Sequence, residues 1–239
     1  RAGGWLDGTT FRDTVERRDH TVYFAALTNN GEHDNFYGPV VSATAVNQEL
    51  SLPGVAAVNL VASLKVSLQG VSETPHSVGV SVNGHYTGEV VFAGRTARTM
   101  TFEVPQSWLV EGTNQVGLLA AGADDISLVD RVAITYSRLR QAVGNRLRFA
   151  GGAGSRATVS GFTTPELVAY DVTSPERPSA LPVKVRKCGG GTFTAEVTLG
   201  IGGESRLVEV LATGQGLAPA AISANSPSSW NLATRGADL

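Results

Sequence analysis

The stretch Leu60-Val61-Ala62-Ser63-Leu64-Lys65-Val66-Ser67-Leu68-Gln69 decides the fold class of this chain. Every second residue from Leu60 to Leu68 is apolar, and most of the residues between them are polar. Because successive side chains of a β-strand point to opposite faces, this period of two predicts a strand with one face in a core and the other toward solvent. Helical spacing is scarce in the rest of the chain. The sequence therefore predicts an all-β protein.

A hairpin is predicted next along the chain. Apolar residues alternate at 78–82 and again at 86–92, and Asn83-Gly84 separates the two runs. Asn and Gly tolerate the positive φ angles of a tight type I′ turn, so this dipeptide favours a hairpin. The same alternation recurs at 100–104, 116–120 and 126–136, which predicts about eight strands between residues 21 and 136.

A compact corner is predicted between two of these strands. The run 104–109 has the composition of one short helical turn, and the run 111–114, Glu-Gly-Thr-Asn, reverses the chain. A corner of this kind links the two sheets of a β-sandwich. We therefore expect residues 1–143 to form a jelly-roll-like β-sandwich, with Trp108 closing one end.

Residues 144–222 are expected to form a second, smaller β-sandwich with immunoglobulin-like architecture. The polar stretch 137–145 and the glycine-rich run 151–154 place the boundary near residue 143. The Cys…Trp…Cys spacing of antibody domains is absent, so the expectation concerns architecture only. Short strands are predicted at 147–150, 156–160, 167–170, 181–186, 192–197 and 206–212. Residues 223–239 are interpreted as a linker to a further domain, with a short helix capped by Ser226, Ser228 or Ser229.

Composition and charge argue against two classes of partner. The 239 residues carry 19 Lys and Arg against 21 Asp and Glu, a net charge of −2, and no long basic stripe. Nucleic-acid binding usually requires such a stripe, so we expect no nucleic-acid partner. Since no apolar run approaches the roughly 20 residues of a spanning helix, we expect no membrane span.

Cys188 is the one cysteine, and it is the first residue to weigh as a catalytic nucleophile. A Cys–His peptidase needs a thiolate within hydrogen-bond reach of an imidazole. Cys188 lies before three glycines in the second predicted sandwich, whereas His20, His33, His76 and His85 all lie in the first. We therefore predict no catalytic residue and no enzymatic activity for this chain.

The run 32–38, Glu-His-Asp-Asn-Phe-Tyr-Gly, is the densest cluster of functional residue types. We assign His33, Asp34, Asn35 and Tyr37 as candidate binding residues, because carboxylate and amide oxygens suit Ca²⁺ and an aromatic ring stacks on a sugar or a partner. The alternative is structural: Asp and Asn close Asx-turns while an aromatic side chain plugs the sandwich edge. No cofactor is predicted, with Ca²⁺ kept open as a ligand of this loop.

Two other groups of residues have a structural interpretation. Asp130 falls on the apolar parity of its strand, near Asp124-Asp125, and indicates a β-bulge or a buried hydrogen-bonded carboxylate; a metal site is the alternative. The glycine-rich runs 151–154, 189–191 and 202–203 lack the strand–Gly–Lys–helix setting of a phosphate loop, so they are predicted to be turns.

Several segments, taken in order, resemble the non-catalytic N-terminal region of gingipain-like cysteine peptidases of the C25 family. These segments are 23–27, 32–39, 80–84, 88–92, 104–114, 128–136, 159–162 and 170–175. Trp230 and 237–239 resemble the linker and the first strand of that family's peptidase domain. The resemblance covers the chain from about residue 15. The catalytic His and Cys of that family lie in a following α/β domain, and no position here matches their motifs.

The resemblance implies a secreted or cell-surface protein whose N-terminal β-domains precede a peptidase domain in the same polypeptide. The expected function is that of a non-enzymatic prodomain or accessory scaffold, with the downstream peptidase domain as partner and the loop at 32–39 as a contact. The alternative is a carbohydrate- or ligand-binding jelly-roll module that takes a glycan or a protein through Asp34, Asn35 and Tyr37.

Overall fold

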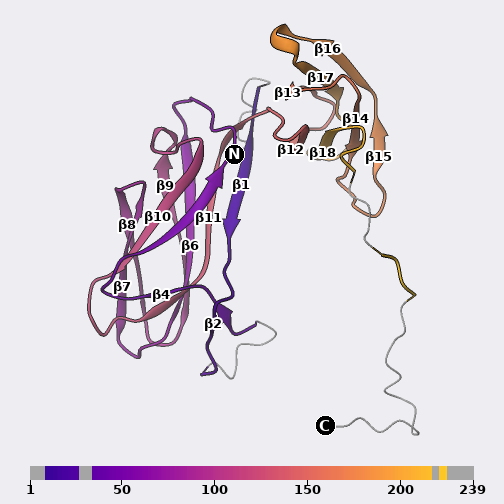
Figure 1. The fold of residues 1–239 in the computed structure, drawn as a ribbon. Coiled ribbons are helices and arrows are strands. Elements are labelled where there is room, and N and C mark those ends of the chain that lie inside the picture. Colours follow the sequence, from indigo (N-terminus) through magenta and orange to yellow (C-terminus); the bar gives the residue numbers. More distant parts are fainter. Residues whose placement is uncertain (1–8, 27–33, 217–220, 225–239) are drawn as a thin grey trace, which may run out of the picture.

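The computed structural model describes residues 9–26, 34–216 and 221–224, and this part of the chain is almost entirely β-structure. The strands form two β-sandwiches that follow one another along the chain (Figure 1). The prediction of an all-β fold is confirmed. The short helix predicted after Ser226 lies outside the described residues.

The first sandwich contains two antiparallel sheets. One sheet has, in this order, β1 (Thr10–Arg17), β11 (Ser127–Leu139), β6 (Val61–Gly70) and β9 (Ala97–Pro105), and β4 (Val40–Val41) also pairs with β11. The other has, in order, β5 (Val46–Leu52), β10 (Gly112–Ala120), β7 (Pro75–Val82) and β8 (His85–Ala93). A small sheet of β2 (Val22–Tyr23) and β3 (Phe36–Tyr37) lies beside them.

The alternation of side chains along β6 places its apolar face in the core, as predicted. Ala62, Leu64, Val66 and Leu68 are buried in the core between the two sheets. The opposite face of β6 is more buried than the pattern suggested, because Ser67 and Gln69 are also inside. Hydrogen bonds satisfy both side chains: the Ser67 and Thr99 hydroxyls lie 2.8 Å apart, and Gln69 donates to the Arg95 carbonyl over 3.0 Å.

The predicted hairpin joins β7 to β8 through Asn83 and Gly84, whose φ angles of 48° and 83° are both positive. The Asn83 amide also donates to the carbonyl of Trp108 and to the side chain of the buried Asn114. The short turn predicted before Trp108 is the 3₁₀ helix η1 (Gln106–Trp108). One asparagine therefore fixes the hairpin turn against the corner between the sheets.

Asp130 marks a β-bulge, which is one of the two structural interpretations that the sequence left open. The pairing of β11 with β6 shifts register between Val129 and Arg131, so Asp130 is the extra residue. Its side chain turns away from the core and lies near Arg18. The bulge explains why a carboxylate interrupts the apolar parity of this strand.

The second sandwich also has two antiparallel sheets. One contains, in order, β12 (Arg146–Gly152), β18 (Ser205–Ala212), β14 (Leu167–Asp171) and β15 (Ser179–Leu181); the other contains β13 (Arg156–Phe162), β17 (Phe193–Thr198) and β16 (Val183–Lys187). Its core includes Phe149, Phe162 and Val208. The glycine-rich run before β17 forms the 3₁₀ turn η2 (Gly189–Gly191), in line with its prediction as a turn.

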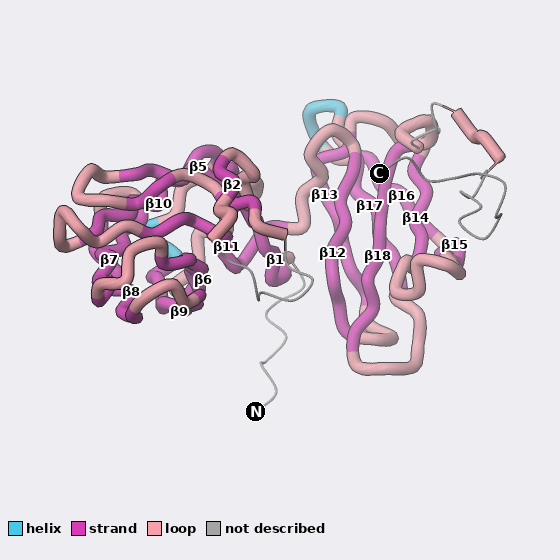
Figure 2. The backbone as a smooth tube through the Cα atoms, turned by 90° about the horizontal axis from the view of Figure 1, so that it is seen from below, coloured by secondary structure: helices cyan, strands magenta, loops and turns pink. Residues whose placement is uncertain are grey.

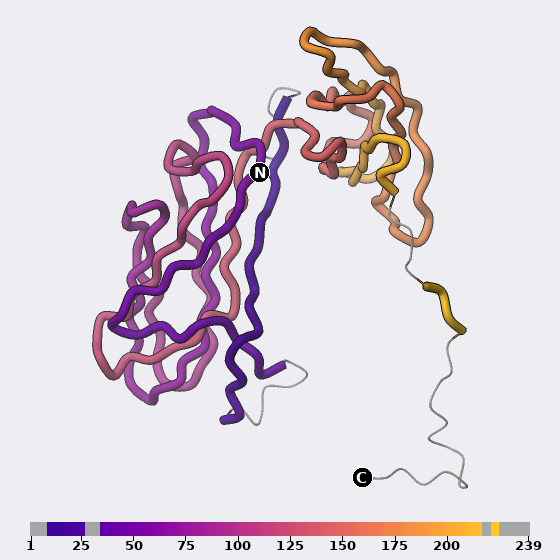
Figure 3. Tube along the Cα trace, viewed as in Figure 1, coloured from indigo at the N-terminus to yellow at the C-terminus, as the bar shows by residue number. Residues whose placement is uncertain are grey.

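The two sandwiches meet where β1 lies next to β12. The strands of the second sandwich run across the direction of those of the first (Figure 2). Figure 3 shows β1, in indigo, on the side of the first sandwich that faces the second. Phe11 of β1 packs into the second core, with its ring centroid 5.9 Å from that of Phe149. Arg140 lies over the same Phe149 ring at 5.2 Å.

Candidate functional site

The structure describes three of the four candidate binding residues, all at the small β2–β3 sheet. His33 lies outside the described residues. Asp34 accepts a hydrogen bond from the Phe36 amide over 3.1 Å, which is the Asx-turn that the structural interpretation predicted. Asn35 accepts from the Phe24 amide through its backbone carbonyl. The local backbone is therefore held by the side chain of Asp34 and by the pairing of β2 with β3.

Arg18 lies between two carboxylates at this sheet. Its guanidinium is 3.3 Å from Asp34 and 3.3 Å from Asp130. The guanidinium of Arg18 therefore occupies the place between the two carboxylates that a bound metal ion would take. Arg18 also joins the segment between β1 and β2 to Asp34, before β3, and to Asp130, at the bulge in β11.

The ring of Tyr37 is buried, whereas the rings of Tyr23 and Phe36 face solvent. Tyr37 is only 7% exposed, and burial, helped by the charges of Asp130 and Asp34, raises the pKa of its hydroxyl. Its ring plugs the sandwich edge instead of facing solvent. Tyr23 and Phe36 are 61% and 44% exposed.

We call His20, Tyr23 and Phe36 the aromatic patch. The ring centroids of Tyr23 and Phe36 are 5.1 Å apart, and those of His20 and Phe36 are 6.3 Å apart. Exposed, clustered aromatic side chains are typical of protein interaction sites. The sequence did not reveal this patch, because strands of two residues are too short to show which side chains face solvent. The sequence assigned the exposed, ligand-binding ring to Tyr37, whereas the exposed ring is that of Phe36.

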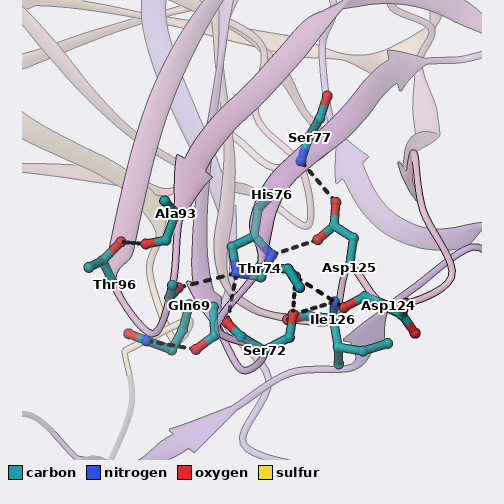
Figure 4. Close-up of polar contacts among 12 residues, drawn as sticks. Gln69, Ser72, Thr74, His76, Ser77, Ala93, Thr96, Asp124, Asp125 and Ile126 are labelled. Atoms are coloured by element: carbon teal, nitrogen blue, oxygen red, sulfur yellow. Dashed lines mark hydrogen bonds and ion pairs between the residues drawn. The ribbon is translucent and has the colours of Figure 1, made fainter.

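A second polar cluster lies at the start of β7, around the buried side chain of His76 (Figure 4). The Nδ1 atom of His76 is 2.5 Å from Oδ1 of Asp125. Its Nε2 atom lies 3.2 Å from the carbonyl oxygens of Ser72 and Gly94. The other oxygen of Asp125 accepts from the Ser77 amide over 2.8 Å. We call these residues the His76 corner.

The geometry of the His76 corner is structural. Both ring nitrogens lie within hydrogen-bond distance of acceptors, Nδ1 of the Asp125 carboxylate and Nε2 of two backbone carbonyls. A general base needs a free lone pair directed at a substrate proton, and His76 offers none here. The corner ties the loop after β6, the start of β7 and the loop before β11 together.

The side chains of Asp124, Asp125 and Asp130 do not form one cluster. Asp125 binds His76, whereas Asp130 pairs with Arg18 and Asp124 contributes its backbone carbonyl to Thr74. Within the residues that the structure describes, no three His, Cys, Asp or Glu side chains are grouped as metal ligands.

Cys188 is remote from every described histidine. It follows β16 in the second sandwich, is exposed, and contacts the Thr194 hydroxyl at 3.9 Å. His20 belongs to the aromatic patch, His76 is buried, and the ring of His85 stacks on Trp108 at 4.5 Å. The helices of the described residues are single 3₁₀ turns, and none is long and apolar enough to cross a membrane.

The double-sandwich arrangement recurs in a solved peptidase structure. A region of dimeric latent PorU from Porphyromonas gingivalis matches 92% of this chain with a TM-score of 0.63, at 13% sequence identity. The chain has the fold of that PorU region. PorU is a gingipain-like peptidase of the C25 family, so the resemblance predicted from the sequence is confirmed at the level of the fold. The match covers 22% of the PorU chain, so this chain spans about a fifth of the length of PorU.

Two carbohydrate-binding modules match a smaller part of the chain. The CBM36-1 domain of a multidomain xylanase from the hindgut metagenome of Trinervitermes trinervoides covers 52% of this chain and 95% of its own, at 13% identity and a TM-score of 0.34. A family 35 carbohydrate-binding module from an environmental isolate covers 53% and 85%, at 20% identity and a TM-score of 0.32. No protein-family model matches the chain, and no curated protein matches it.

Proposed function

We propose that this chain is a non-catalytic accessory region, a prodomain or scaffold, of a secreted or cell-surface protein that carries a gingipain-like cysteine peptidase domain. The observation that supports this most is the match to latent PorU, which extends over both sandwiches and 92% of the chain. The match includes the succession of a larger and a smaller sandwich, so the shared feature is the whole two-domain unit.

The aromatic patch is the surface that we assign to the peptidase domain. Tyr23 and Phe36 present ring area to solvent, and the ion pairs of Arg18 with Asp34 and Asp130 hold the backbone beneath them. Rigid aromatic side chains lose little conformational entropy on binding, so they serve well as anchors of an interface. Docking through this patch buries the two rings against the partner.

The side chains of the described residues support a non-enzymatic role. His76 is committed to Asp125 and to two carbonyl groups, His85 is stacked on Trp108, and Cys188 lies in the other sandwich. These residues build and brace the sheets. The chemistry of peptide cleavage is then assigned to the partner domain, and this chain supplies a surface.

Co-elution of separately produced parts tests this proposal. The first step is to read the coding sequence after Leu239 and to produce alone the peptidase domain that we expect there. This domain is then mixed with the chain, and the mixture is analysed by size-exclusion chromatography and by a peptidase assay. We expect a complex, together with a changed activity or a higher yield of folded enzyme. A following sequence without a C25-type domain, or two parts that elute separately with unchanged activity, would refute it.

Glycan binding is the second candidate function, and the outer face of the β5–β10–β7–β8 sheet favours it. Tyr86 is 61% exposed, lies over Gly79, and donates to Glu89 over 3.0 Å. An exposed aromatic ring beside a carboxylate suits a sugar, because the apolar face of the sugar stacks on the ring and its hydroxyl groups donate hydrogen bonds to the carboxylate. In this candidate Tyr86 takes the role that the sequence assigned to Tyr37, because the ring of Tyr37 is buried.

A further inference from the structure

A cleft lies between the two sandwiches, and arginine side chains dominate its polar lining. Its volume is about 470 Å³, and its walls come from β1, β11, β12 and the segment between them. The charged lining residues are Arg12, Asp13, Arg138, Arg146 and Arg148. Four arginines and one aspartate therefore line the cleft.

Two of these arginines have carboxylate partners and two do not. Arg138 is 2.7 Å from Asp13, and Arg146 pairs with Glu209. Within the described residues, the guanidinium of Arg12 donates to the carbonyls of Val61 and Thr135, over 3.0 and 3.1 Å, and neither of these residues lines the cleft.

Arg148 is the freest of the four. It is exposed, and it makes no hydrogen bond or ion pair with the described part of the chain. Glu209 faces it across the β12–β18 pair, but the carboxylate of Glu209 is bound to Arg146. Among the described residues, the cleft consequently retains one arginine without a hydrogen-bond or carboxylate partner, Arg148.

Two strand edges and an exposed valine beside the cleft favour an extended ligand with apolar side chains. β1 and β12 are each the terminal strand of their sheet, so each leaves one backbone edge unpaired within the sheets. An unpaired edge is a template for an added strand. Val143, which is 58% exposed, lies in the same cleft and offers an apolar contact.

We propose that this cleft binds an extended acidic peptide segment of a partner protein, with a carboxylate of the peptide paired with Arg148. Arginine forms two parallel hydrogen bonds with a carboxylate, which adds direction as well as charge. The apolar contact at Val143 and the strand edges fit a polypeptide better than a polyphosphate, which has neither apolar side chains nor amide groups. This proposal does not depend on the docking function of the aromatic patch.

The test uses the full chain and a short fluorescein-labelled peptide in which Glu and Val alternate. Fluorescence anisotropy measures its affinity at low and at physiological salt, beside a control peptide with Gln in place of Glu. Inorganic polyphosphate serves as the non-peptide anion in competition. The variant Arg148→Glu is compared with Arg156→Glu, because Arg156 is equally exposed, lies on β13 outside the cleft, and changes the net charge by the same amount.

We expect the Glu peptide to bind more tightly than the Gln peptide, and salt to weaken its binding because exposed charges are screened over about 8 Å at physiological ionic strength. Arg148→Glu should lower its affinity about tenfold relative to Arg156→Glu, which corresponds to about 1.4 kcal/mol. The proposal is overturned by equal losses in the two variants, by equal binding of the two peptides, by no binding of the Glu peptide, or by an Arg148-dependent site that takes polyphosphate alone.

Discussion

The Nδ1 atom of His76 lies 2.5 Å from Oδ1 of Asp125, and both side chains are buried at the end of the first sandwich. They come from segments 49 residues apart, so the pair links β7 to the loop before β11. Removal of one member of a buried hydrogen-bonded pair leaves the polar group of the other without a partner, which costs more than the intact pair contributes. The His76 corner is therefore a point where small changes should have large effects on stability.

Asp125→Asn should destabilise the chain by about 3 kcal/mol. The amide side chain that this substitution introduces can accept one of the two hydrogen bonds that Asp125 accepts, from His76 and from the Ser77 amide, but its NH₂ group then faces the other donor. Urea denaturation measures the change, and Asp124→Asn is the control because Asp124 is exposed. Equal stability of the two variants would contradict a bracing role for the pair.

Gly70→Ala should be similarly damaging, for a steric reason. A Cβ atom at Gly70 would lie 2.1 Å from the Gly94 carbonyl oxygen and 2.7 Å from Nε2 of His76, so backbone would have to move. We expect a loss of about 3 kcal/mol in the free energy of unfolding. Gly79→Ala is the matched control within a strand, since its Cβ would make only an ordinary contact at 3.6 Å, and its effect should stay within about 0.5 kcal/mol.

Asp171 should make the second sandwich sensitive to acid. Burial alone would raise the pKa of this carboxyl, but hydrogen bonds from Thr173 and the charge of Arg206 outweigh burial and hold the pKa below its ordinary value of 3.8. Its stabilising contribution is therefore complete above that ordinary value and is lost as the pH falls through the native pKa.

Asp171→Asn should accordingly cost about 1 kcal/mol near pH 7, and the difference from the original chain should shrink in acid. Urea denaturation at a series of pH values measures this difference. Glu176→Gln provides the comparison, because Glu176 is exposed. A penalty for Asp171→Asn that stays constant down to about pH 2 would show that the charge of Asp171 contributes nothing.

Tyr86→Ala distinguishes the glycan-binding candidate from the docking proposal. If the outer face of the β7–β8 hairpin binds a sugar, a glycan array should give signals that Tyr86→Ala removes and that Tyr23→Ala leaves intact. The glycan should raise the melting temperature of the original chain and of Tyr23→Ala but not that of Tyr86→Ala, because a ligand of the folded state stabilises it. An array without Tyr86-dependent signals excludes this candidate. The same melts with and without a chelator show whether Ca²⁺ stabilises the chain.

The longer strands β6, β7 and β8 were predictable from sequence because each carries its own period of two, whereas β1 and the two-residue strands were not predicted individually. The hairpin at Asn83-Gly84 and the bulge at Asp130 were predictable for a similar local reason, a turn dipeptide and a break in parity. The aromatic patch and the cleft were not, because they depend on how distant segments pair. Whether Phe36 or Tyr37 faces solvent is set by the pairing of β2 with β3, and Arg148 meets Arg12 only through the packing of β12 beside β1.

Isothermal titration of this chain into the peptidase domain that we expect in the same polypeptide tests the central claim most directly. The docking account predicts a saturable one-to-one complex, and the double variant Tyr23→Ser with Phe36→Ser should weaken it at least about tenfold, since aromatic anchors carry much of an interface's energy. The matched variant Tyr86→Ser with Val91→Ser removes exposed apolar area from β8 instead and should leave the affinity unchanged. The absence of binding, or equal losses in the two double variants, would contradict the account.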